Sequence, residues 1–278
     1  MIAPPTLSRR LVTTDLPVLG VVLLALGPFA WMILTSITSG QHLAALGVAV
    51  IPADWVIDNY ARLIAHTSFL VNMGHSLVVA LGTMAFGLVV SVTAAYAFSR
   101  FSFIGRRLLM MQFLLVNLFP VVLLILPLFV LMRRLGLLDT HVALIVANAT
   151  TAIPFSVWML TSYINAIPVS LDEAAMIDGC SRLQALRRIV LPLAVPGIVS
   201  TGIYIFITAW NEYLFALTLG GRNVRTVTVA IQTLIGEYQI EWGLLSAGGV
   251  VGALPATILF LFVQRRLVGG LAQGAVKG

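Results

Sequence analysis

The sequence predicts an all-α polytopic membrane protein with six transmembrane helices. Its 278 residues are 60% hydrophobic and only 9% charged, with a mean hydropathy of +1.04, whereas soluble domains carry about 25% charged residues. A chain this apolar cannot cover its own surface with polar groups, so its main solvent must be lipid. Six apolar stretches reach the roughly 20 residues that a membrane helix needs. The alternating strands of about ten residues that build a membrane barrel are absent from the sequence.

The six predicted spans are continuous apolar runs, and together they predict one transmembrane domain over residues 1–278. The first run follows Arg9 and Arg10 as a signal peptide would, but its apolar core is too long and no A-x-A site follows. We therefore expect a retained helix. Pro120, Pro127 and Pro154 should kink the third and fourth spans. The spans cover about residues 16–37, 71–98, 108–132, 142–164, 197–219 and 244–263.

The distribution of basic residues predicts the orientation of the chain. With both termini in the cytoplasm, eleven of the sixteen Lys and Arg residues fall in inside segments and five fall outside. This excess follows the positive-inside rule, and it explains the net charge of +6 without nucleic acid. The inside residues are Arg9, Arg10, Arg100, Arg106, Arg107, Arg182, Arg187, Arg188, Arg265, Arg266 and Lys277.

An inside segment, about residues 166–196, is predicted to form a helix–turn–helix that projects from the membrane bundle. Ser170 and Glu173 form an S-x-x-E capping box, which predicts the start of a short helix. Gly179 suits the left-handed residue that ends this helix. Ser181 can cap a second short helix. The apolar stripe of that second helix comprises Leu183, Leu186, Ile189 and Val190.

The same segment carries a spaced motif. Glu-Ala-Ala stands at 173–175, Gly at 179 and Ile-Val-Leu-Pro at 189–192. This EAA---G---------I-LP pattern resembles the permease subunits of bacterial ATP-binding-cassette importers. The resemblance implies that the helix–turn–helix is a knob that fits a cleft on a separate ATPase subunit and moves with it. It implies the coupling residues Glu173, Ala174, Ala175, Gly179, Ile189, Leu191 and Pro192, with Asp178 and Arg182 as further polar candidates.

Glu173 has a second interpretation. In a capping box it stabilises the helix by about 1 kcal/mol and need contact nothing else. A bare S-x-x-E box is common, whereas the full spaced pattern is not, so we favour the coupling role. Ala174 and Ala175 fit that role because their small side chains allow another protein to approach closely.

Two further segments resemble the second permease of maltose-type and other sugar importers. They are residues 209–214, Ala-Trp-Asn-Glu-Tyr-Leu, and the tail at 264–278. The resemblance implies a carbohydrate substrate, a paired second permease, two ATPase subunits and an extracytoplasmic sugar-binding protein. The chain lacks G-x-x-x-x-G-K-[ST]. It is therefore expected to bind no cofactor and to catalyse no reaction, while ATP and Mg²⁺ are used by the partner ATPase.

Polar residues inside the predicted spans are candidates for the substrate pathway. Glu212 is the only acid that falls clearly within a span, where a charge usually faces a cavity or a partner. The alternative is hydrogen bonding to the partner subunit. Ser and Thr in spans are more often packing residues. The pathway candidates are Asn211, Glu212, Tyr213, Asn148, Thr151 and Asn117, with Thr150 beside them.

Two outside segments, about residues 39–70 and 220–243, contain aromatic residues that serve either as interfacial anchors or as docking points for an external partner. The main alternative function is an ATP-independent secondary transporter or channel. Such proteins usually need ionisable residues in the membrane, and only Glu212 offers one. An intramembrane enzyme is poorly supported because neither G-x-S-x-G nor H-E-x-x-H occurs. The histidines show no metal-binding spacing, and Cys180 has no partner cysteine.

Overall fold

The computed structural model describes residues 14–39, 55–236 and 240–274, with side chains described as far as residue 262. In these ranges the chain is helical, and its extended contacts are two isolated bridges, Thr38 with Trp55 and Ile235 with Ile240. The all-α prediction is confirmed. The described residues form two compact units, one within Met1–Phe69 and Ile231–Ala253 and the other within Leu70–Ala230 and Leu254–Gly278.

The first unit is built around a junction between two helices. Helix α2 (Leu16–Ser36) ends where α4 (Asp58–Ala65) begins to pack on it. The Asn59 side-chain amide donates to the carbonyl oxygens of Ser36 at 2.9 Å and Thr38 at 3.0 Å. A Cβ at Gly243 would lie 2.6 Å from the same amide nitrogen. Asn59 therefore closes the buried carbonyls at the end of α2, as buried polar groups require.

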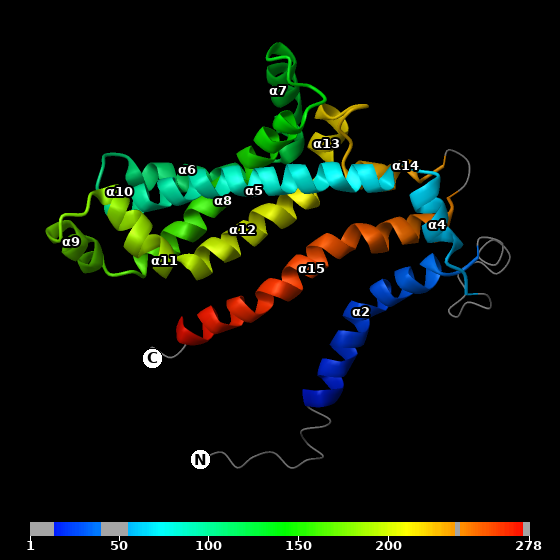
Figure 1. The fold of residues 1–278 in the computed structure, drawn as a ribbon, viewed down its shortest axis with the longest axis horizontal. Coiled ribbons are helices and arrows are strands. Elements are labelled where there is room, and N and C mark those ends of the chain that lie inside the picture. Colours follow the sequence, from blue (N-terminus) through cyan, green and yellow to red (C-terminus); the bar gives the residue numbers. More distant parts are fainter. Residues whose placement is uncertain (1–13, 40–54, 237–239, 275–278) are drawn as a thin grey trace. The chain divides into compact units, whose positions relative to one another are not determined.

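The second unit holds most of the helices, and α14 and α15 each belong partly to it and partly to the first unit. Helices α5, α8 and α12 run alongside one another, and the short helices α9 to α11 lie at one end of them (Figure 1). The elements are α5 (Phe69–Arg100), α6 (Arg106–Leu118), α7 (Val121–Arg134), α8 (His141–Asn165), α9 (Val169–Ile177), α10 (Arg182–Ala185), a π-helical turn η2 (Leu186–Val190), α11 (Leu191–Leu193), α12 (Val195–Trp210), α13 (Leu214–Leu219), α14 (Val227–Thr233) and α15 (Trp242–Gly274).

Within the described residues, four helices are long and apolar enough to cross a membrane, namely α2, α5, α8 and Trp242–Phe262 of α15. Two bent pairs raise the number to six if each pair counts as one span. The predicted third span is such a pair: α6 and α7 meet at 99° across Phe119 and Pro120. Pro127 and Pro154, in contrast, lie inside α7 and α8 without ending them. The predicted fifth span stops at Trp210, and α13 is a separate short helix after it.

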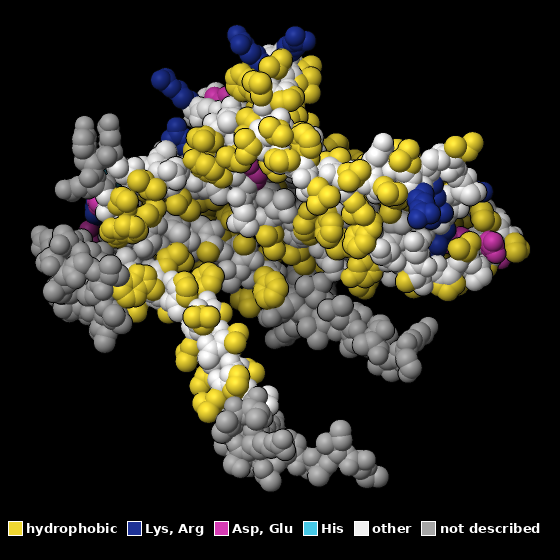
Figure 2. Space-filling model, turned by 180° about the vertical axis from the view of Figure 1, so that it is seen from behind, with side chains coloured by type: hydrophobic (Ala, Val, Ile, Leu, Met, Phe, Trp, Pro, Cys, Tyr) yellow, Lys and Arg dark blue, Asp and Glu magenta, His cyan; other side chains and the backbone are white. Residues whose placement is uncertain are grey.

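Helix α8 is the buried centre of the second unit. In the most apolar 18-residue stretch of α8, 50% of the residues are buried within the chain. It approaches α12 closely because Gly197 has no side chain: a Cβ there would lie 2.5 Å from Cγ of Tyr163. The outer surfaces of the helices are apolar instead, as hydrophobic side chains spread over the molecule show (Figure 2). Leu24 of α2, for example, is 81% exposed. Such surfaces are suited to lipid rather than water.

Candidate functional site

The predicted helix–turn–helix is present as α9, α10, η2 and α11. We call residues 166–194 the knob. Its turn forms as expected: Gly179 has φ +87°, a left-handed conformation that favours glycine. The Cys180 N–H donates to the Ala175 carbonyl at 2.9 Å, closing the end of α9. Ser181 caps α10 in a reciprocal box with Gln184, which confirms the second cap.

The capping box predicted from Ser170 and Glu173 is wrong. Helix α9 begins at Val169, with Pro168 as its N-cap and no side-chain cap. Pro168 has ψ 132°, an extended value outside the helix, and Val169 directly after it is the first helical residue. The helix therefore starts before Ser170. Ser170 then lies in the first turn, where it cannot act as a cap. The exposed carboxylate of Glu173 is not explained by capping.

Helix α9 and the turn after it have a buried face and an exposed face, and the predicted coupling residues fall on both. Asp172 and Ala175 are buried against the chain, at 4% exposure each. Glu173, Ala174, Asp178 and Gly179 are exposed. Ala175 therefore permits close packing within this chain and is not available to another protein. The knob also exposes large apolar side chains, namely Leu171, Met176 and Ile177 of α9 and Leu183 of α10, with Ile177 86% exposed.

The second helix of the knob packs differently from the predicted stripe. Leu186 and Val190 are buried, and Ile189 and Leu191 are partly buried, but Leu183 is 55% exposed. The Arg182 guanidinium lies 4.7 Å from the centre of the Phe101 ring, a cation–π contact within the chain. Pro192 is exposed in the first turn of α11, so the helical path continues through it and bends by 80° into α12.

The sequence-based prediction missed the residues that hold the knob. Arg100, at the end of α5, forms a buried ion pair with Asp172 of α9: Nε lies 2.9 Å from Oδ2, and each side chain is 5% exposed. The Tyr96 hydroxyl donates to Oδ1 of Asp172 at 3.2 Å. The only local signals for this pair in the sequence were an acid, Asp172, directly before Glu173 and an arginine, Arg100, at the end of a predicted span. The partners stand 72 residues apart, so no local pattern in the sequence joins them.

The pathway candidates near the end of α12 form a local structural motif. The Glu212 carboxylate accepts the N–H groups of Phe215 at 2.7 Å and Ala216 at 3.0 Å, so it caps α13. The Thr228 hydroxyl donates to the Glu212 carbonyl at 2.8 Å. Asn211 is exposed after α12, and Tyr213 packs on an apolar cluster that includes Phe215. The acid thus satisfies the backbone at the break between two helices.

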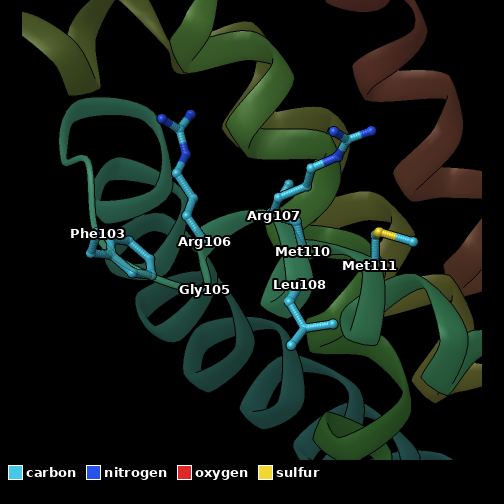
Figure 3. Close-up of a pocket in the computed structure, with 7 residues that line it drawn as sticks. All are labelled: Phe103, Gly105, Arg106, Arg107, Leu108, Met110 and Met111. Atoms are coloured by element: carbon cyan, nitrogen blue, oxygen red, sulfur yellow. The ribbon is translucent and has the colours of Figure 1, made fainter.

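The remaining pathway candidates bond to their own helices. Asn117 donates to the Phe113 carbonyl, and Thr150 and Thr151 donate to carbonyls three residues earlier. Asn148 is 2% exposed; its amide donates to the Leu144 carbonyl, and its Oδ1 has no hydrogen-bond partner among the described residues. A hollow of about 820 Å³ lies elsewhere, at the start of α6 (Figure 3). Its lining includes Arg106 and Arg107 and none of the pathway candidates.

Two contacts join segments that lie far apart in the sequence. Within α5, Nδ1 of His75 lies 2.8 Å from Nε2 of His141, the first residue of α8. The Asp139 carboxylate accepts the backbone N–H of Asn223 at 3.0 Å and of Val224 at 2.9 Å, and the Asn223 side chain at 2.9 Å. Among the described residues no group of three or more His, Cys, Asp or Glu side chains could hold a metal ion.

The pKa of Asp139 lies below its ordinary value. Burial raises this pKa, but the backbone hydrogen bonds from Asn223, Val224, Arg222 and Gly221 together outweigh it. A depressed pKa adds stability above the ordinary value, near about pH 3.9, and that stability is lost as the pH falls through the folded-state value. We expect amide exchange at Asn223 and Val224, corrected for its intrinsic pH dependence, to accelerate as the pH falls below about 3.9.

Asp139→Asn should accelerate exchange of these two amides at neutral pH by about three- to tenfold, because a net hydrogen bond contributes about 0.5–1.5 kcal/mol. Amides in the middle of α5 serve as the control and should not change. Hydrogen exchange read by mass spectrometry measures both. Equal exchange in the variant and the parent chain would show that Asp139 does not hold this loop.

Comparison with known proteins places this architecture in a family. Residues 87–273 match the family described as "Binding-protein-dependent transport system inner membrane component". The sulfoquinovosyl glycerol transport system permease protein SmoH of Agrobacterium fabrum is 37% identical over 252 residues, covering 90% of this chain and 88% of the relative. The trehalose/maltose transport system permease protein MalG of Thermococcus litoralis is 36% identical over 268 residues, covering 94% and 96%.

The fold comparison agrees. A chain from the crystal structure of a bacterial ABC transporter involved in the import of the acidic polysaccharide alginate superimposes with a TM-score of 0.80 at 24% identity, covering 94% of this chain and 98% of that chain. The family match includes the whole knob and extends through α8 and α12 into α15. This chain therefore belongs to the family of inner membrane components of binding-protein-dependent transport systems, and it is a multi-pass membrane subunit.

Proposed function

We propose that this chain is the permease subunit through which an ATP-binding-cassette importer moves a sugar across the membrane, paired with a second permease and driven by two separate ATPase subunits that dock on the knob. The observation that carries the proposal is the exposed face of the knob. It presents Ile177, Met176, Leu171 and Leu183 beside the exposed carboxylates of Glu173 and Asp178.

This face has the composition of a protein interface. Large apolar side chains exposed together on structured helices usually mark a binding surface, and interface cores are apolar with a polar rim. Lipid is the other apolar solvent, but the knob also exposes Arg182, Arg187 and Arg188, which mark a cytoplasmic position under the positive-inside rule. The same rule supports cytoplasmic termini.

The substrate class rests on the relatives. The two permeases named above belong to systems for sulfoquinovosyl glycerol and for trehalose and maltose, and a third, DasC of Streptomyces coelicolor, belongs to a diacetylchitobiose uptake system and is 31% identical over 255 residues, covering 90% of this chain and 91% of the relative. All three names contain a glycoside. An extracytoplasmic binding protein is supported by the family description, and it would deliver the sugar to the outer face.

The proposed cycle is alternating access. Two ATPase subunits close on ATP and Mg²⁺ and draw together the knobs of this chain and its paired permease. The bundle then opens outward to the loaded binding protein, and ATP hydrolysis resets it inward. The ATP-independent alternative needs an intramembrane ionisable group that is free to bind an ion. The Glu212 carboxylate instead accepts two backbone N–H groups of α13, which favours the ATP-driven mechanism.

A truncation on the knob tests the proposal. Ile177→Ala should weaken ATPase association about tenfold, because the few residues that dominate an interface each cost more than about 1 kcal/mol when truncated and Ile177, at 86%, is the most exposed large apolar side chain of the knob. The measurement is the amount of ATPase that co-purifies with the tagged chain after dilution. The matched control is Leu126→Ala, since Leu126 on α7 is similarly apolar and 71% exposed but far from the knob in the sequence. Equal ATPase recovery from both variants would contradict docking on the knob.

The assembled complex in liposomes tests the transport claim. With its binding protein outside and ATP inside, it should accumulate at least one radiolabelled sugar from a panel of trehalose, maltose, diacetylchitobiose and sulfoquinovosyl glycerol. Ile177→Ala should lower this uptake together with ATPase association. Uptake that proceeds equally without ATP would favour the secondary transporter.

A further inference from the structure

The junction between α5 and the knob is held by directional polar contacts. Arg100 donates from Nε to Asp172 at 2.9 Å and from a terminal nitrogen to the Ile167 carbonyl at 3.0 Å. Tyr96 donates to the other oxygen of Asp172. One turn of α5 therefore contacts the knob on both sides of Pro168, the point where α9 begins. We call Tyr96, Arg100, Ile167 and Asp172 the anchor.

The anchor lies on an apolar cluster that includes the second helix of the knob. Leu186 and Val190 pack there with Ala95 and Tyr96 of α5 and with Leu160 and Ile164 of α8. The hydrophobic effect that stabilises these contacts is non-directional. The charge-assisted hydrogen bonds of the anchor fix a distance and an orientation as well. Outside the anchor, Ser99 adds a further hydrogen bond, to Asn165 at 2.7 Å.

Helix α5 extends the junction to the opposite end of the second unit. Its 32 residues span roughly 48 Å at about 1.5 Å per residue, and Figure 1 shows it running from α9 and α10 to the level of α14. Near its other end the Ser76 hydroxyl accepts the Val227 N–H at 2.7 Å, at the first residue of α14. One continuous helix thus bonds to the knob at one end and to the segment that starts α14 at the other.

We propose that Arg100 and Asp172 are positioning residues that make the knob and α5 one rigid body, so that a displacement of the knob reaches the outer end of α5 undiminished. This inference rests on the proposed function, because it assumes that the ATPase acts on the knob. A buried ion pair is poor evidence of stabilisation by itself, since apolar replacements are often as stable. What it adds is a fixed geometry, which a force-bearing joint requires.

Distance measurements by electron paramagnetic resonance test the joint without knowledge of the sugar. One spin label is placed on Cys180, the single cysteine of the chain, and the other on Val71→Cys at the far end of α5, where Val71 is 61% exposed. In the full complex, the distance distribution should stay the same and narrow with and without ATP and Mg²⁺. A shift in the wild-type distance on adding ATP and Mg²⁺ would overturn the proposal.

The decisive variant is the apolar pair Arg100→Met with Asp172→Leu, which removes the directional bonds while keeping the volume filled. Its distribution should be about twofold broader and should shift with ATP and Mg²⁺, as expected for a joint released into slow collective motion. Tyr96→Phe keeps the ring and removes one hydrogen bond, so it should broaden the distribution less. Thr93→Val on the same helix is the control, because the Thr93 hydroxyl is exposed and bonds only to its own preceding turn.

A double variant that keeps the wild-type distance distribution would overturn the proposal. If the double variant does not accumulate in the membrane, Tyr96→Phe is used instead, and a wild-type distance distribution in that variant would overturn the proposal. ATPase recovery is measured in the same preparations. ATPase recovery tests the proposed function: a wild-type value for Ile177→Ala would count against docking on the knob. The spin-label distances test the joint separately, because they report whether the knob and α5 move as one body.

Discussion

Gly179→Arg is expected to lower both ATPase association and ATP-driven uptake at least tenfold while the chain still reaches the membrane. Gly179 has φ +87°, and a Cβ added there would meet no heavy atom within 4 Å. The effect therefore comes from the backbone, because a side chain in the left-handed region costs about 1–2 kcal/mol. The turn between α9 and α10 relaxes, the exposed apolar face changes shape, and the arginine itself projects from the docking surface.

Gly136→Arg is the matched control for Gly179→Arg. Gly136 also has a positive φ, of 66°, with open space around it, but it lies in the loop between α7 and α8. It carries the same kind of backbone strain and the same added charge. Per molecule of chain in the membrane, its ATPase recovery should match that of the parent. If Gly179→Arg retained both ATPase recovery and uptake, the knob could not be the docking element.

Asp172→Leu alone is expected to destabilise the chain by about 3–5 kcal/mol, because it leaves the Arg100 guanidinium buried without its partner. Arg100→Met alone should do the same to Asp172. The double variant should recover most of the loss, since an apolar pair of similar volume replaces the ion pair without leaving a charge unpaired. The measurement is the midpoint of thermal unfolding of the detergent-solubilised complex, with membrane abundance as a second readout.

The other ion pair of the described residues shows the contrast. Arg62 and Glu241 lie 2.6 Å apart, but their side chains are 40% and 54% exposed. Water screens them, so Glu241→Gln should change stability by no more than about 1 kcal/mol. Equal effects of Asp172→Leu and Glu241→Gln would mean that the Arg100–Asp172 pair is not buried from solvent in the assembled protein.

The sequence alone determined the features that depend on neighbouring residues. Continuous apolar runs located α2, α5, α8 and α15 to within a few residues, apart from the C-terminal end of α15, because burial in lipid acts on every residue of a run. Gly179 and Ser181 were correctly placed at the turn and the cap, since both roles are set by φ, ψ and by atoms three or four residues away. The start of α9 was misplaced because Pro168 sets it before Ser170 can act.

Only the tertiary structure decided the rest. The third span bends by 99° at Pro120, an angle that a hydropathy profile does not contain. Glu212 caps α13 because the helix is interrupted at residues 211–213. The apolar residues on both sides of this interruption hide it from a hydropathy profile. Arg100 and Asp172 meet because α5 and α9 are brought together by packing around α8, although 72 residues separate them along the chain. The sequence located the knob from local rules, but what holds it to the membrane helices is a long-range contact that exists only in the folded chain.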